Sequence, residues 1–572
     1  MKNSRKHIIL FFVLSTFLLP MGCADFLDRQ PLDQRSRETY FTSETEIQTV
    51  LNSTYRRLRS TVIGGFVSGN GTGSSLDFEA LTDNGWTDSG FMNLQNFGTG
   101  TNTSSSNNGA SNTMWEQCWQ GVSDCNFFLD NLERPEVKAL VSDATYRRFR
   151  GEALFNRSLY YHLLLEHFGN LPWVDRWVTA EMPFLEMPRL PKSQIVDNIL
   201  RDLTEAIEGL PLPVAGYTNG RVIQSSAIML KVRILMANHR FQEAITAAEL
   251  LINNPSNPHR IVDSFSGIFF GEQTNNREII FSVQYNGAID RHSYDFVTGT
   301  RQSCYPLGSL AVAFGTQADG SPDPRLRFTM FVPGDPWLMN TLKNPDGTPL
   351  LGTAGTITFP YPYDLGTFTF TNGQFPARLL HDNGAGGLQG LRIVADGEVK
   401  AWSLGWRKGI DPANNDFRQS VSLQDRVMMR YADLLLLYAE AKVEIGGGTT
   451  TDPAALAAFN AVRTRSSVNM PAVAEITREI VRNERRVELA YEGIRLYDIL
   501  RWNIGHEVIP TKVIDGTVVG GKATSLSMTT IPARANVAGS NGITAVPQVW
   551  RGNLWPIPQN VMNIMEHWEQ NP

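Results

Sequence analysis

Residues 227–251 read AIMLKVRILMANHRFQEAITAAELL and decide the fold class of this chain. In both halves of this stretch, apolar residues recur every three to four positions, a period that predicts two amphipathic helices. The first helix is marked by Ala227, Leu230, Ile234 and Leu235, and the second by Phe241, Ala244, Ile245, Ala248 and Leu251. Only a few residues separate them, so the stretch predicts a hairpin of helices.

The hairpin has about the length of a tetratricopeptide unit, which pairs two helices in roughly 34 residues. A second hairpin is expected late in the chain, with the following apolar positions: Tyr431, Leu434, Leu435 and Tyr438 on one helix, and Leu456, Phe459 and Val462 on the other. A third late helix is expected from about 477 to 502. Similarity between the units is weak, so we predict tetratricopeptide-like packing, with generic antiparallel helices as the alternative.

Two further helices are expected between these hairpins and the start of the chain. Apolar residues at helical spacing run through 146–168, where Gly169 suits a helix C-terminus and Pro172 prevents resumption. Another apolar stripe runs through 195–210, with Ser193 as the expected N-cap and Pro211 as the stop. Helices therefore dominate both ends of the mature chain.

Two stretches have a different composition. Residues 61–112 are rich in Gly, Ser, Thr and Asn, which predicts a long irregular loop of the kind that is often functional. Residues 255–425 mix short strand-like runs, such as 278–285, with clusters of turn residues. The expected fold is mainly α: a tetratricopeptide-like helical scaffold with long irregular loops and small β elements.

The start of the chain indicates export. Lys2, Arg5 and Lys6 precede an apolar run at 8–19, and the small residue Gly22 stands just before Cys23. This pattern is typical of a signal peptide, and the run is too short for a permanent membrane helix, which needs about 20 residues. We expect residues 1–22 to be removed and Cys23 to be acylated as in bacterial lipoproteins. The alternative is an ordinary cleaved signal followed by an incidental cysteine.

The overall composition excludes some classes of function. The chain has 572 residues, 42% of them hydrophobic, and a net charge of −6. An acidic balance argues against nucleic acid as a partner, because neutralising phosphates requires a basic face. Cys118 and Cys125 are seven positions apart in a helical segment, roughly 10 Å along its axis, which is too far for a disulfide. Both are expected to be buried thiols.

Catalytic and metal-binding patterns are almost absent. His506-Glu507 lacks the second histidine of a zinc-protease motif, and 516–523 resembles a phosphate loop but carries Ala523 where a hydroxyl should reach magnesium. Charged residues crowd 484–501 at spacings of three and four, which predicts ion pairs on a helix surface. A carboxylate pair there, Glu488 and Glu492, is the only candidate for sugar hydrolysis. We expect a protein without enzymatic activity, metal or cofactor.

Aromatic residues in the irregular regions are the candidate ligand contacts. Trp86, Phe91 and Phe97 lie in the first loop, and Tyr305 and Trp337 in the second. Flat rings on loops suit the apolar faces of sugars, and loops carry binding function more often than scaffolds do. The alternative is that each ring attaches its own loop to the helical body. We select Trp86, Phe91, Tyr305 and Trp337 as candidate ligand-binding residues.

Several motifs in a fixed order resemble the SusD/RagB family of outer-membrane lipoproteins from Bacteroidetes. They are CADFLD at 23–28, GEALFNR at 151–157, FGNLP at 168–172, NREIIFSVQY at 276–285, DPR at 323–325, RYADLLLLYAEA at 430–441, EGIRLYD at 492–498, and LWPIP at 554–558 followed by QNP at 570–572. The resemblance covers essentially the whole mature chain. It divides the sequence into a signal peptide at 1–22, an N-terminal SusD-like helical region with a loop insertion at 23–254, and a C-terminal SusD/RagB region at 255–572.

The resemblance implies a cell-surface binding protein without catalytic activity. Such proteins are held in the outer membrane by a lipid anchor, face the exterior, and cover a SusC-like TonB-dependent transporter to which they deliver oligosaccharides. Only the acylated Cys23 carries over by position, because the ligand residues of the family follow no fixed motif. Oligopeptide capture for the same kind of transporter is the main alternative, and a surface glycoside hydrolase is a further one.

Overall fold

A computed structural model gives the fold of the chain. The structure describes residues 40–66, 74–87, 92–104, 109–179, 182–212, 220–285, 290–331, 405–410, 422–509 and 550–571, with gaps of one to five residues in some of these ranges, and short strands within 355–390 and 513–532. Candidate residues Cys23, Phe91 and Trp337 lie outside the described residues.

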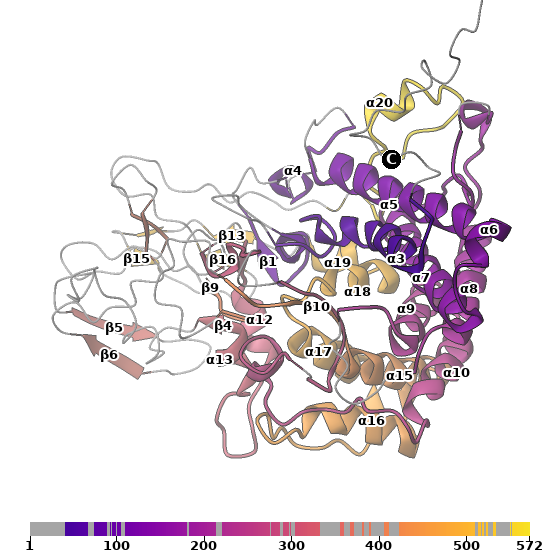
Figure 1. Ribbon diagram of the computed structural model, residues 1–572. Helices are drawn as coiled ribbons and strands as arrows, with labels where there is room; N and C mark the ends of the chain where they lie inside the picture. Colours follow the sequence, from indigo (N-terminus) through magenta and orange to yellow (C-terminus); the bar gives the residue numbers. More distant parts are fainter. Residues whose placement is uncertain are drawn as a thin grey trace, which may run out of the picture.

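Long helices form one wall of the molecule, in an order that follows the sequence (Figure 1). They are α3 (Glu44–Ser53), α5 (Ala110–Leu132), α7 (Asp143–Phe168), α8 (Lys192–Gly209), α9 (Gln224–Ala237) and α10 (Phe241–Ile252). Helix α7 packs against α5 and α8, α8 against α9, and α9 against α10. This succession of antiparallel neighbours is the predicted tetratricopeptide-like arrangement, and the mainly α fold class is confirmed.

The late helices extend the same body. They are α15 (Tyr431–Ile445), α16 (Pro453–Arg463), α17 (Arg478–Glu488), α18 (Arg495–Trp502), α19 (Gly505–Val508) and α20 (Gln559–Met562). Helix α15 packs on α10 and also on α16 and α17, so it joins the early helices to the late ones. The predicted hairpin of α15 and α16 is confirmed.

The end of α7 agrees with the prediction from sequence, whereas the start of α8 does not. Helix α7 ends at Phe168, and Gly169 follows with φ +72°, as the sequence indicates. Ser193 was expected to cap α8, but the N-cap is Pro191. The backbone N–H of Lys192 donates to Asn170 Oδ1 at 2.9 Å, so a side chain from another segment satisfies the helix start. The N-cap prediction is therefore wrong.

The single helix expected at 477–502 is two helices, α17 and α18. Between them Tyr491 and Gly493 have φ values of +58° and +75°, which no α-helix accommodates. Tertiary partners stabilise the break, because Lys408 Nζ donates to the carbonyl oxygens of Glu488 and Ala490 at 2.9 and 3.0 Å. A distant lysine thus replaces the hydrogen bonds that a continuous helix would supply.

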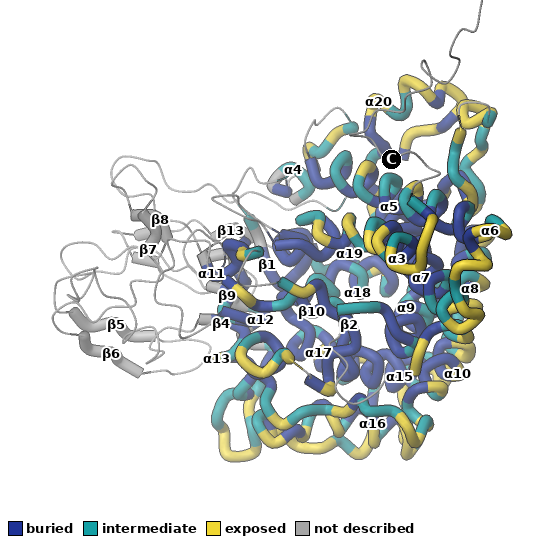
Figure 2. The backbone as a smooth tube through the Cα atoms, in the orientation of Figure 1, coloured by how far each residue is buried: buried dark blue, intermediate teal, exposed yellow. Residues whose placement is uncertain are grey.

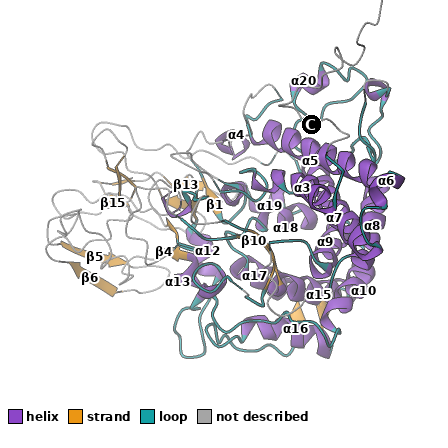
Figure 3. Ribbon diagram, viewed as in Figure 1, coloured by secondary structure: helices purple, strands orange, loops and turns teal. Residues whose placement is uncertain are grey.

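Short elements fill the space between the helices and the loops (Figure 3). The short helices are η2 (Arg56–Arg59), η3 (Ser75–Leu81), α4 (Leu94–Gly98), α6 (Pro135–Lys138), η5 (Phe184–Glu186), η6 (Ser266–Ile268), α11 (Tyr294–Phe296), α12 (Gly308–Ala313) and α13 (Arg325–Thr329). Part of the predicted irregular loop at 61–112 is therefore ordered. Ser74 and Asp77 form a capping box at η3, whose residues are all buried.

The strands form two-stranded sheets. The antiparallel pairs are β1 (Gly85–Trp86) with β3 (Tyr305–Pro306), β2 (Ile279–Val283) with β10 (Arg426–Arg430), β4 (Met330–Phe331) with β9 (Gly405–Trp406), β5 (Gly355–Phe359) with β6 (Gly366–Phe370), β7 (Leu380–Asp382) with β8 (Leu388–Gly390), β11 (Thr449–Thr450) with β12 (Ile476–Thr477), and β14 (Val518–Val519) with β15 (Lys522–Ala523). Strand β13 (Val513–Asp515) pairs in parallel with β16 (Thr530–Pro532). The strand predicted at 278–285 is confirmed as β2.

An apolar core runs through the helical body (Figure 2). The inner helices α9, α15 and α18 are largely buried, whereas α8, α10, α16 and α17 carry exposed residues on their outer sides. Cys118 and Cys125 are buried in this core as thiols without a disulfide, as predicted. Among the described residues, no helix is both long and apolar enough to cross a membrane.

Candidate functional site

The structure brings two of the predicted ligand residues together. Strands β1 and β3 form an antiparallel ladder in which Trp86 is the register partner of Tyr305. The two residues come from the two irregular regions that the sequence singled out. We call Asp83–Trp86 together with Tyr305–Leu307 the platform. It lies at the edge of the helical body, beside β9, β4 and α12 (Figure 1).

Two arginines attach the platform to the helices. Arg495 of α18 makes a bidentate ion pair with Asp83, with both distances at 2.8 Å. Arg486 of α17 donates to Asn84 Oδ1 at 2.7 Å and to the Asp83 carbonyl oxygen at 2.8 Å. The backbone N–H of Leu307 donates to the Asn84 carbonyl oxygen at 2.8 Å. Bidentate guanidinium contacts fix geometry as well as charge, so the backbone at Trp86 is held firmly.

A buried carboxyl group connects the platform to the break between α17 and α18. Glu79 is 1% exposed and accepts from the Tyr491 backbone N–H at 2.8 Å and from Asn84 Nδ2 at 3.1 Å. Burial raises the pKa of Glu79 to about 7, because desolvation disfavours the charged form more than its hydrogen bonds favour it. The carboxyl group therefore changes protonation near neutral pH.

An aromatic stack lies beneath the platform. Trp406 of β9 is stacked on Tyr491, with ring centroids 4.3 Å apart and planes within 7°. Both rings are buried, and β9 contacts β3. Trp406 was not among the sequence candidates, since nothing in its local sequence marks it as more than one of twelve tryptophans. Trp406 and Tyr491 therefore pack beneath the platform and support it.

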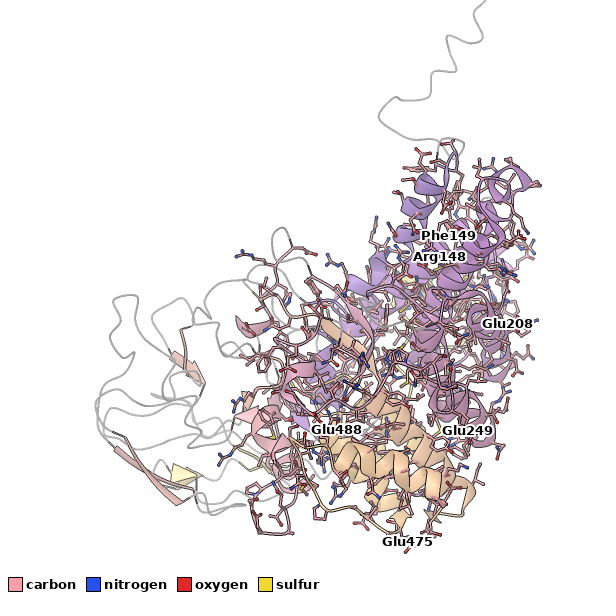
Figure 4. The ribbon with its side chains drawn as sticks, turned by 60° about the horizontal axis from the view of Figure 1, so that its bottom comes forward. Arg148, Phe149, Glu208, Glu249, Glu475 and Glu488 are labelled. Atoms are coloured by element: carbon pink, nitrogen blue, oxygen red, sulfur yellow. The ribbon has the colours of Figure 1, made fainter. Side chains whose placement is uncertain are left out.

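The charged residues of 484–501 form a buried network instead of pairs on a helix surface. Glu488 is fully buried and accepts from Arg325 at 2.8 Å, Arg430 at 2.7 Å and Arg465 at 2.6 Å. Figure 4 places Glu488 inside the body, whereas Glu208 and Glu475 lie at its periphery. The prediction of helix-surface pairs is wrong, because these cations come from other elements and neutralise the carboxylate within the core.

The network is poorly suited to acid–base catalysis. Burial alone would raise the pKa of Glu488, but Arg465, Arg430 and Arg325 lower it well below its usual range. Glu492 accepts from Arg430 and Lys408, and its pKa is also lowered. A general acid needs a pKa near the working pH, and the lowered pKa values leave both carboxylates ionised there; Glu488 is in addition fully buried.

The remaining sequence motifs are structural or have no described counterpart. Phe97 packs on Trp555 at 4.8 Å between ring centroids, which matches the alternative that a ring attaches its own loop. The stretch 516–523, which resembles a phosphate loop, contains the strand pair β14–β15. A true phosphate loop would instead lead into a helix. His506 and Glu507 have side chains that are both 63% exposed. The described residues contain no cluster of His, Cys, Asp or Glu that could hold a metal ion.

Taken together, the helices and the platform define a mainly α, tetratricopeptide-like scaffold that carries loops at one edge. The model described as "SusD family" matches residues 315–572, and the model described as "Starch-binding associating with outer membrane" matches residues 25–234. The chain belongs to the SusD/RagB family.

Individual relatives match this chain at low sequence identity. SusD-like protein P2 of Formosa agariphila is 23% identical over 88% of this chain and 92% of its own. A SusD-like carbohydrate-binding protein of Bacteroides fragilis has a TM-score of 0.70 at 24% identity, over 92% of this chain and 99% of that one. A laminarin-binding SusD-like protein has a TM-score of 0.62 at 20% identity, over 93% and 99%.

Proposed function

We propose that this protein captures oligosaccharides at the cell surface and delivers them to a SusC-like TonB-dependent transporter, without catalysing a reaction. The observation that carries the proposal is the β1–β3 ladder, which makes Trp86 and Tyr305 register partners on a firmly attached platform. Aromatic residues next to one another on a rigid support suit the stacking of sugar rings. Family membership and the carbohydrate-binding relatives agree with this choice of ligand.

The rest of the proposal concerns how the protein is held. Residues 1–22 serve as the signal peptide and Cys23 as the lipid attachment site, so that regions 23–254 and 255–572 face the exterior from the outer membrane. One acyl chain gives only marginal membrane binding, so stable attachment requires more than one. Phe91 and Trp337 remain proposed ligand contacts together with Trp86 and Tyr305.

Titration calorimetry of the mature protein tests the ligand. The panel contains laminarin, starch and other soluble polysaccharides, and an oligopeptide mixture. We expect binding to at least one glycan, and a loss of tenfold or more in affinity, about 1.4 kcal/mol, for both Trp86→Ala and Tyr305→Ala. Tyr146→Ala is the matched control, since Tyr146 is a partly exposed tyrosine on α7 far along the chain from either strand.

The same experiment separates the alternatives. Binding to peptides without binding to any glycan would replace the proposal by oligopeptide capture. Release of reducing sugar by the wild-type protein, abolished in Glu488→Gln, would show a hydrolase instead. Co-purification of a SusC-like transporter from native outer membranes tests the partner. Metabolic labelling with palmitate that is lost in Cys23→Ser tests the anchor.

A further inference from the structure

A second surface feature is lined by residues other than those of the platform and lies along α5. It is an apolar groove of about 330 Å³ with three walls. Trp119 and Val122 of α5 form the first wall, Val174 and Val178 of the extended stretch 172–178 form the second, and Ile564 and Trp568 of the C-terminal stretch form the third. Figure 1 shows α20, at the start of the third wall, next to α5.

The groove is open and unusually apolar. Ile564 is 60% exposed and Phe184, at its rim, is 38% exposed, so large apolar side chains face solvent together. Two large apolar side chains exposed in the same groove form a candidate docking surface. Cooperation between three distant segments in building it also indicates a site and not an incidental gap.

Its chemistry does not suit a sugar. The lining contains three polar side chains besides the tryptophan indoles: Ser123, Asn126 and Arg176. Asn126 is already committed, since its Nδ2 donates to the Val174 carbonyl oxygen at 2.8 Å and its Oδ1 accepts from Arg157 at 2.9 Å. Sugar recognition needs several polar groups beside the rings, so an apolar peptide segment fits this groove better.

The chain itself enters the body at one end of the groove. Phe41 is buried and packs on Phe127 and Phe128 of α5, with ring centroids 6.1 and 6.4 Å apart. Phe127 in turn packs on Trp177 of the second wall at 5.2 Å. Asn126, which lines the groove, directly precedes Phe127 in α5, so Phe41 packs beside the part of α5 where the groove ends.

The segment before this entry point has the right length and composition. Residues 24–39 lie outside the described residues, and their sequence, ADFLDRQPLDQRSRET, sets Phe26, Leu27, Pro31 and Leu32 among charged residues. The α5 wall from Trp115 to Asn126 spans roughly 16 Å. Five extended residues cover roughly the same distance, the seven residues 26–32 reach about 23 Å, and sixteen residues reach about 50 Å. The segment is long enough to lie along the whole groove.

We propose that residues 26–32 of this chain dock in the groove between α5, the stretch 172–178 and the C-terminal stretch. Phe26, Leu27 and Leu32 cover the apolar walls, and the charged residues between them face water. Docking does not depend on a lipid at Cys23. If Cys23 is acylated, as the proposed function holds, the docked segment leaves almost no free tether, and the body sits close to its anchor.

Site-specific photo-crosslinking tests the docking in the mature chain carrying Cys23→Ser. Benzoylphenylalanine is introduced at Phe26, and as a control at Arg37, followed by irradiation and peptide mass spectrometry. From position 26 we expect intramolecular crosslinks to peptides covering 115–126 or 561–568, with a yield that does not change on dilution. Ile564→Glu should lower that yield at least fivefold, and Leu250→Glu, which changes a leucine 52% exposed on α10, should leave it unchanged.

Three outcomes would overturn the proposal. One is crosslinking from position 26 only to other parts of the chain. Another is crosslinking that yields only dimers and rises with concentration, which would assign the groove to a second copy. The third is an unchanged yield in Ile564→Glu, verified as folded by circular dichroism. Because no glycan or transporter is present, these results are independent of whether the proposed function holds.

Discussion

Helices α8 and α17 belong to one scaffold but are held in it by different interactions. Helix α8 buries Ile195, Ile199 and Leu203, and its charged residues are mostly exposed. Helix α17 buries Glu484, Arg485 and Glu488, and its cations and carboxylates pair with residues of other elements. A charged helix can thus lie in a core when each charge has a partner, although such pairing is costly to disrupt.

The largest effect is expected from removing the centre of the network. In Glu488→Ala, the guanidinium groups of Arg325, Arg430 and Arg465 remain buried without their shared carboxylate. Breaking a buried pair typically costs about 3–5 kcal/mol. We expect a loss of that order in the free energy of unfolding, measured by urea denaturation. Glu208→Ala on the exposed side of α8 is the control, with a change of less than about 0.5 kcal/mol. A small loss in Glu488→Ala would show that the network is dispensable.

The apolar counterpart is a cavity mutation in α8. Leu203 is fully buried, and Leu203→Ala removes side-chain atoms that the surrounding helices cannot fully replace. A loss of about 2–4 kcal/mol is expected from the same denaturation experiment. Leu212→Ala, at a position 50% exposed, should change little. An unchanged free energy of unfolding in Leu203→Ala would show that the apolar contacts of α8 stabilise the fold less than the ion pairs of α17.

Glu79 differs from Glu488, because its hydrogen-bond partners do not offset the cost of burying its charged form. The folded pKa of about 7 lies above the unfolded value of 4.5. The folded protein therefore keeps a proton that the unfolded chain has lost, and the stability from this group is greatest below pH 4.5 and falls as the pH rises through 7. One pKa unit corresponds to about 1.4 kcal/mol, so the effect is at most about 3 kcal/mol.

The measurement compares Glu79→Gln with the wild type by thermal unfolding at pH 5 and pH 8. The variant should gain in melting temperature relative to the wild type as the pH rises, because the amide never becomes charged. The buried histidines His162 and His167, whose pKa values burial lowers to about 4 and about 3, affect both proteins equally. An identical difference at both pH values would contradict the raised pKa of Glu79.

The smallest effect on stability is expected for an arginine–glutamate pair at the surface. Arg150 of α7 pairs with Glu205 of α8, and the two side chains are 25% and 48% exposed. A double-mutant cycle with Arg150→Ala and Glu205→Ala should give a coupling of about 0.2–1 kcal/mol that decreases in high salt. A coupling as large as the loss in Glu488→Ala would remove the distinction between buried and exposed pairs.

The apolar helices could be predicted from the sequence because their pattern is local. The spacing in 227–251 and 146–168 identified α9, α10 and α7, and Gly169 marked the end of α7. The expectation that Cys118 and Cys125 are buried thiols followed from their separation of seven positions in a helical segment. Here each residue's environment depends on neighbours three or four positions away, so periodicity is enough.

The charged helices could not be predicted in the same way. Spacings of three and four among Glu488, Glu492 and Arg495 fit a solvated helix face, and the cations that bury Glu488 come from far along the chain. The break at Tyr491 likewise depends on Glu79 and Lys408. Of the predicted ligand residues, Trp86 and Tyr305 were selected for their loops, but nothing in the sequence shows that they are register partners.

By itself, the sequence determined the helical class, the positions of several long helices, the likeness to the SusD/RagB family and the two loop regions that supply aromatic residues. These follow from local periodicity, turn residues and ordered motifs. Only the tertiary structure decided which loops meet, where the helix at 477–502 breaks, and that its charges are buried. The reason is that a charge becomes stable in a core only through partners distant in the chain, and only the folded structure brings those partners within hydrogen-bonding distance.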